Sequence, residues 1–257
     1  MPLRDAPLPR MAGHLPFMRG PVAALGALRP GQVAAFGAGI GHGHDDASLE
    51  PLGLRETSSY FGSHFASNMK AAMDVDQRRV LDPAAVSGRL VDLGDIDFAH
   101  AGEPPADCVA SLSAAVAARG AIPILLGGSP PLAEAMRRGL SEALKADVRA
   151  VGLRDALPEP AGRTPPLLAV LDLAEVASVW HGGSVRAGFA GVSLSQARSR
   201  LREIGSQEVV GAAVVGLDPA RQGLSTVKTG QRLLVTALLD LIYARLDALA
   251  DRETAHA

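Results

Sequence analysis

Short apolar runs alternate with amphipathic stretches along most of the chain. The apolar runs predict strands at residues 33–36, 90–97, 122–126, 147–153, 167–173 and 209–217. Helical periodicity predicts helices at residues 51–64, 108–119, 132–145, 193–204 and 228–250. Strands that are apolar throughout are typical of a parallel sheet buried on both faces. The alternation therefore predicts an α/β fold with three α-β-α layers around a mostly parallel, doubly wound sheet.

The stretch 121–136 gives the clearest local pattern. Its apolar run ends in Gly127 and Gly128, and a predicted helix begins immediately afterwards. Two glycines let the backbone turn sharply at the carboxyl end of the strand, where ligands bind in open α/β sheets. Ser129 suits the N-cap and Pro130 the first turn of the helix. We expect a strand, a tight turn and a helix that together face a site.

Composition narrows the class of protein. The 257 residues suffice for a full core, and we expect an irregular arm over residues 1–30 before a single domain over 31–257. A net charge of −2 without a basic block argues against nucleic acid, and no apolar run is long enough to cross a membrane. The single cysteine, Cys108, and the lack of a hydrophobic leader predict a reducing, cytoplasmic location.

Several segments, in order, resemble the ureohydrolases, the family of arginase, agmatinase and formiminoglutamase. Leu54-Arg-Glu-Thr-Ser58 is similar to the family's Ile-Arg-Glu-Ala-Ser, and Asp92-Leu-Gly-Asp95 to its Asp-Leu-Gly-Asp. The tetrad Gly127-Gly-Ser-Pro130 stands where the family has Gly-Gly-Asp-His. A final strand, loop and long helix also match. The resemblance extends over residues 33–249 and implies an arginase/deacetylase-like fold.

Ureohydrolases hold two divalent ions with carboxylates and imidazoles at strand ends, and the ions share the attacking hydroxide. Here the resemblance implies that most ligands are absent, because neutral or cationic side chains cannot hold dications. Asp172 keeps the first carboxylate of the Asp-x-Asp-x-x-Asp-Pro motif as a vestigial candidate. The degenerate motif positions are Gly127, Gly128, Ser129 and Pro130, then Arg154 and Asp155 in place of Asp-x-His-x-Asp, then Ala174 and Ala177, and Gly216 near the family's late Glu.

The short stretch of sequence between Asp155 and Asp172 also implies that the catalytic machinery is absent. Active relatives have a much longer segment between the corresponding motifs, and that segment carries the catalytic His loop. We therefore expect no catalytic residue and no metal held by this chain. Asp172 is also suited to capping a nearby loop.

Other residues offer alternative sites. His42, His44, Asp45 and Asp46 bring four potential ligands into a Gly-rich loop and form the best alternative metal cluster. Asp92, Asp95 and Asp97 are expected to set turn geometry, and Trp180-His181 to contact either a partner or the body of the domain. A nucleophilic role for Cys108 lacks an accompanying His or Asn motif.

Three functions follow from this interpretation. The first is a non-catalytic ureohydrolase-fold subunit that assembles, in a trimer- or hexamer-like hetero-oligomer, with an active paralogue containing Ni or Mn. Heteromeric biguanide (metformin-type) hydrolases, which pair one active and one inactive subunit, resemble this arrangement. The alternatives are a diverged C–N hydrolase with a non-standard metal site, and a module that binds a small cationic ligand in the old cleft.

Overall fold

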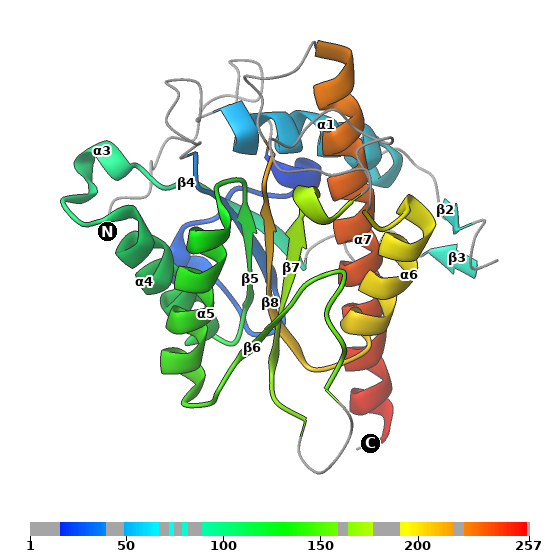
Figure 1. The fold of residues 1–257 in the computed structure, drawn as a ribbon. Coiled ribbons are helices and arrows are strands. Elements are labelled where there is room, and N and C mark those ends of the chain that lie inside the picture. The colour runs from blue at the N-terminus through cyan, green and yellow to red at the C-terminus, as the bar shows by residue number, and fades with distance from the viewer. Residues whose placement is uncertain are drawn as a thin grey trace.

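The computed structural model describes residues 16–39, 49–66, 72–74, 79–81, 89–158, 164–176, 191–217 and 224–255. A six-stranded sheet with the order β4-β1-β5-β8-β7-β6 forms its centre, and every neighbouring pair is parallel (Figure 1). The strands are β1 (Val33–Gly37), β4 (Leu90–Asp95), β5 (Ile122–Leu126), β6 (Arg149–Val151), β7 (Leu167–Asp172) and β8 (Val209–Val215). The predicted parallel, doubly wound sheet is confirmed.

Helices cover both faces of this sheet and complete the three predicted layers (Figure 1). One face carries α1 (Leu49–Ala66), α6 (Leu194–Gly205) and α7 (Leu224–Ala255), and the other carries α3 (Phe98–Ala101), α4 (Pro105–Ala117) and α5 (Pro130–Leu144). No helix among the described residues combines the length and apolarity needed to cross a bilayer.

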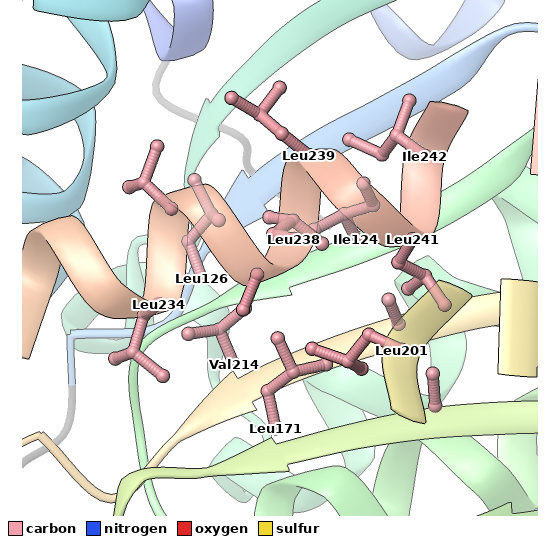
Figure 2. Close-up of a cluster of buried hydrophobic side chains, with 14 of the residues drawn as sticks. Ile124, Leu126, Leu171, Leu201, Val214, Leu234, Leu238, Leu239, Leu241 and Ile242 are labelled. Carbon is pink, nitrogen blue, oxygen red and sulfur yellow. The ribbon is translucent and has the colours of Figure 1, made fainter. Parts of the chain in front are cut away.

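The core consists of one hydrophobic cluster on each side of the sheet. Successive residues of a strand alternate between the two clusters, as the period of two requires. In β5, Ile124 and Leu126 pack toward α7, whereas Leu125 packs toward α4 and α5. Figure 2 shows the α7 side, where Leu234 and Leu238 lie against the strand side chains. Because both faces bury apolar residues, central strands such as β5 and β8 are apolar throughout.

The observed elements depart from the prediction at their ends and in the segments between them. α4 begins at Pro105 rather than at Cys108, whose buried thiol contacts the Glu103 carbonyl oxygen. α7 is longer at both ends than the predicted 228–250 helix. The small hairpin of β2 (Ala72–Asp74) and β3 (Arg79–Leu81) was not predicted.

The part of the arm that the structure describes packs against the outer edge of β4. The backbone N–H of Asp92 donates to the Pro21 carbonyl, and the Ala23 N–H donates to the Asp92 carbonyl, both at 3.0 Å. Phe17 is fully buried, and its N–H donates to Asp92 Oδ2 at 2.6 Å. The arm therefore covers backbone groups that an edge strand otherwise exposes.

Candidate functional site

The carboxyl ends of the parallel strands form one edge of the sheet, where the sequence predicts a site. Four of these ends carry a glycine, namely Gly37 at the end of β1, Gly127 after β5, Gly152 after β6 and Gly216 after β8. We call these four residues, together with Gly128 and Asp172, the crest. Gly127, Gly128 and Gly216 have φ values of 82°, 88° and 83°, which confirms the predicted sharp turn of the Gly-Gly pair.

A carboxylate from elsewhere in the fold lies against each of these strand-end glycines. Glu50, in the first turn of α1, is 1% exposed, and its Oε2 accepts a hydrogen bond from the Gly128 N–H at 2.6 Å. A Cβ atom on Gly127 would come within 3.1 Å of the Glu50 carboxylate. The glycine pair therefore makes room for an internal acid in addition to shaping the turn.

Asp172 occupies the corresponding position beside Gly216. Its Oδ1 accepts from the Ala174 N–H at 2.9 Å and caps the 3-10 turn η3 (Leu173–Glu175). A Cβ atom on Gly216 would overlap this same oxygen. The Gly216 N–H donates to the Gly128 carbonyl at 3.1 Å, so the ends of β5, β7 and β8 are joined at this point. Asp172 thus serves as a cap in this structure.

The segment after β6, where the resemblance places the second ligand motif, is held by its own contacts. Glu175 Oε2 accepts from the Leu153 N–H at 2.7 Å, and Asp155 Oδ2 accepts from the Gly152 N–H at 2.8 Å. The Arg200 guanidinium donates to the Asp155 carbonyl oxygen. Each of these hydrogen bonds stabilises the turn that follows β6.

Arg154 lies in this segment with its side chain exposed. Burial raises the pKa of the neighbouring Glu175 carboxyl, and Asp155 and Asp172 raise it further, while Arg154 and the Leu153 N–H lower it. Arg154 therefore acts on the Glu175 carboxyl from the surface, through its positive charge.

At the β4 end of the sheet, the acids form a buried ion-pair network. Arg55 of α1 is fully buried and donates from Nε to Asp92 Oδ2 at 2.7 Å and from Nη2 to Asp92 Oδ1 at 2.9 Å. Its Nη1 donates to Asp95, whose carboxylate lies against Gly37. Burial alone would raise the pKa of Asp92, but attraction and hydrogen bonds from Arg55 outweigh it and lower that pKa. For the same reason the pKa of Arg55 is raised.

The described residues at the predicted ligand positions offer few side-chain ligands for a metal. Ser129 occupies the N-cap of α5 without a side-chain cap bond, and Pro130 is the first residue of that helix. The side chain of Ala174 has no atom that can bind a metal ion. Within the described residues, no three His, Cys, Asp or Glu side chains are grouped so as to hold a metal ion. The donor set that is described does not fit a binuclear centre. Ala177, the His42–Asp46 cluster and Trp180-His181 lie outside the described residues.

Sequence reasoning missed two of the acids at this edge and the main role of a third. Glu50 directly precedes the predicted start of its helix, and Glu175 lies between the two positions that were compared with metal ligands. Asp92 was expected to set turn geometry, and its Oδ1 does accept from the Gly94 N–H at 2.8 Å. Asp92 also forms an ion pair with Arg55. This pairing is not evident from the two sequence motifs that contain these residues, Leu54–Ser58 and Asp92–Asp95.

Comparisons with known proteins give matches among solved structures alone. No family model matches the chain, and no curated protein matches it. Formimidoylglutamase from Bacillus subtilis superposes with a TM-score of 0.67 at 14% identity, covering 94% of this chain and 96% of that one. Proclavaminate amidino hydrolase from Streptomyces clavuligerus superposes with a TM-score of 0.66 at 16% identity, covering 94% of this chain and 100% of that one.

Agmatine ureohydrolase of Thermoplasma volcanium gives a TM-score of 0.62 at 12% identity, covering 94% of this chain and 98% of that one. At such identities the likeness establishes the fold, over nearly the whole length of both chains. This chain therefore has the three-layer α/β fold of the arginase-type ureohydrolases.

Proposed function

We propose that this chain is a non-catalytic subunit with a ureohydrolase fold, which assembles with an active, metal-dependent hydrolase of guanidine-class compounds. The observation that carries the proposal is the state of the carboxylates that lie against the crest glycines. Glu50, Asp172 and Glu175 each accept a backbone N–H of the crest or of the turn beside it. In a binuclear hydrolase, strand-end oxygens are needed for the ions instead.

The chemistry of the motif positions supports the same proposal. Each side-chain ligand of a divalent ion must offer a lone pair, and the side chains of Pro130, Ala174 and the cationic Arg154 offer none. Asp172 alone remains of the matched ligands, and its Oδ1 holds the Ala174 N–H. A shared hydroxide would therefore lack the two ions that generate it.

The described part of the framework around the crest is nevertheless intact. The sheet and both hydrophobic clusters are present, and the fold matches agmatine ureohydrolase over most of its length. A chain that keeps its packing surfaces without a metal cage is suited to association. The partner we propose is an active, agmatinase-like paralogue with Ni or Mn, in a trimer- or hexamer-like cytoplasmic assembly. Its substrate class is guanidines, including biguanides of the metformin type.

Co-expression with a ureohydrolase encoded beside this gene tests the assembly. Native mass spectrometry of the purified material should show particles that contain both chains in a fixed ratio. Two separate homomeric particles would count against the proposal. The isolated chain, loaded with Mn²⁺ or Ni²⁺, should not hydrolyse agmatine or metformin.

A matched pair of substitutions in the complex tests which subunit carries the chemistry. Asp172→Asn in this chain keeps an oxygen for the Ala174 N–H and should leave turnover of the complex unchanged. The Asp→Asn change at the corresponding metal ligand of the paralogue should abolish turnover. Equal losses from both changes would instead assign a catalytic role to this chain.

The alternative is a diverged C–N hydrolase that uses a non-standard metal site. The observation in its favour is the grouping of His42, His44, Asp45 and Asp46 within five residues of the sequence. Metal analysis of the purified chain separates the two proposals. Stoichiometric Ni, Mn or Zn that is lost in His44→Ala would favour the hydrolase.

A further inference from the structure

The carboxyl ends of β1 and β5 meet where the chain leaves the sheet in opposite directions. The two strands are parallel neighbours. The next described helix after β1 is α1, which packs on the α7 side of the sheet through Leu54, whereas α5 follows β5 and packs on the opposite side through Leu132. In open α/β sheets, ligands bind outside the carboxyl ends of two such strands. We call the space over Gly37, Gly127 and Gly128 the switch-point position.

The first turn of α1 fills this switch-point position. A Cβ atom on Gly37 would come within 2.7 Å of Pro51 Cβ, and one on Gly127 would come within 3.1 Å of Glu50 and 3.2 Å of Pro51. In Figure 1, α1 lies above the sheet, at the end where the strands finish. The strand-end glycines therefore leave room for a segment of the chain itself.

Glu50 is held in the switch-point position as a bound carboxylate would be. Its side chain is directed at the Gly-Gly turn, its Oε2 accepts from the Gly128 N–H at 2.6 Å, and the residue is 1% exposed. A hydrogen bond from a backbone N–H to a carboxylate is charge-assisted, and it is stronger than one between neutral groups. A buried acid is costly unless it is held in this way. The geometry therefore selects a carboxylate at this point.

The helix that carries Glu50 is fastened to the sheet a little more than one turn later. Arg55 of α1 is fully buried, and its guanidinium donates to Asp92 and Asp95 of β4. Displacement of the first turn of α1 would strain this buried ion pair, whose separation is unfavourable. The Glu50 carboxylate is therefore fixed in place.

We propose that the switch-point position is a carboxylate-binding site whose ligand is the chain's own Glu50. The first turn of α1 is a permanent internal plug, which occupies the place where other open sheets bind small molecules. Replacement of Glu50 by Ala would remove a CH₂ group and a carboxylate, and these are the atoms of acetate. The plug belongs to this chain alone, so its test does not depend on the proposed partner subunit.

Thermal unfolding of Glu50→Ala in sodium acetate at neutral pH tests the site. Without acetate, the variant should unfold at a lower temperature than the wild type, because the Gly128 N–H loses its buried acceptor. Acetate at several times its dissociation constant should raise that temperature by about 2–4 °C beyond the effect of equimolar sodium chloride, because it binds the folded state. If the variant is largely unfolded without ligand, acetate should restore its far-UV circular dichroism, and chloride should not.

Acetamide has nearly the same shape as acetate and no charge. It should stabilise Glu50→Ala less than acetate does, because its hydrogen bond with the Gly128 N–H is not charge-assisted. Equal effects of acetate and acetamide would overturn the assignment of an anion site. Equal effects of acetate and chloride would overturn the site altogether.

Two further variants supply matched controls. Glu50→Gln keeps the size of the side chain and an oxygen for the Gly128 N–H, so the switch-point position stays filled. Glu142→Ala removes an exposed glutamate of α5. Acetate should stabilise neither variant, nor the wild type, more than chloride does. An acetate-specific shift in any of these three proteins would contradict the proposal, because binding would then not require removal of the plug.

Discussion

Arg55 and Asp92 form a two-pronged ion pair in which neither side chain is exposed by more than 2%. The pair joins α1 to β4, and the same aspartate also accepts from the Phe17 N–H of the arm and from the Gly94 N–H of its own strand. One carboxylate therefore links three separate stretches of the chain.

Removal of one partner from this ion pair should destabilise the protein strongly. We expect Asp92→Asn to lower the free energy of unfolding by about 3–5 kcal/mol, because it leaves the Arg55 charge buried without its full counter-charge. Urea unfolding measures the change. The Arg138–Asp107 pair is more than half exposed on both sides and provides the control. Asp107→Asn should change stability by no more than about 1 kcal/mol.

The Glu175 carboxyl should give stability a pH dependence of defined sign. Its pKa is raised above the ordinary value of 4.5, chiefly by burial. Between 4.5 and the raised pKa, the folded chain binds more protons than the unfolded chain at this group, so its contribution to stability falls as pH rises. Glu175→Gln keeps an oxygen that accepts from the Leu153 N–H, and it removes the loss of stability with rising pH.

The unfolding free energy of Glu175→Gln relative to the wild type should therefore increase from pH 4 to pH 8. Urea titrations at several pH values measure it. Glu134 is the control, because a hydrogen bond from Arg137 lowers its pKa. Glu134→Gln should produce a small change of opposite sign, and a flat difference for Glu175→Gln would contradict the assignment.

Two serines at helix N-caps should respond differently to the same substitution. Ser193 makes a full capping box with Gln196 at the start of α6, whereas Ser129 makes no side-chain cap bond at the start of α5. We expect Ser193→Ala to lower the unfolding free energy by about 1 kcal/mol, and Ser129→Ala to change it by less than about 0.5 kcal/mol. Thermal unfolding of the two variants distinguishes them, and equal losses would contradict the geometry.

Gly139 should tolerate no side chain, because α5 crosses α4 at this point. A Cβ atom on Gly139 would overlap the backbone carbonyl of Ala110. We expect Gly139→Ala to lower the unfolding free energy by about 1–3 kcal/mol through overpacking, as urea unfolding would measure. A Cβ atom on Gly26 would meet nothing within 4 Å, so Gly26→Ala serves as the control. The unfolding free energy of Gly26→Ala should lie within about 0.5 kcal/mol of the wild-type value.

The sequence predicts the fold well because burial on both faces of a parallel sheet leaves a direct mark on residue type. All six central strands were expected close to their observed positions, and so were α1, α4, α5, α6 and α7. Ser193, where the predicted 193–204 helix begins, is the N-cap of α6 in the structure. The hairpin of β2 and β3 and the short helix α3 involve three or four residues each, which is too few for periodicity to emerge.

The candidate site was predictable only in part. Gly127 and Gly128 are evident in the sequence, because their sharp turn requires positive φ. The acids that lie against them come from distant positions, as Glu50 does for Gly128. No local pattern connects such residues, since their contact depends on how α1 docks on the sheet. For the same reason, the sequence presents Arg55 and Asp92 as members of two unrelated motifs.

The docking of the arm also bears on the order of events during synthesis. The Met18 N–H donates to Ser58, 40 residues further along the chain, and the Phe17 N–H donates to Asp92, 75 residues further along. Phe17 and Met18 leave the ribosome before these partners do. They can settle only after α1 and β4 have emerged, so this segment is secured late in the maturation of the protein.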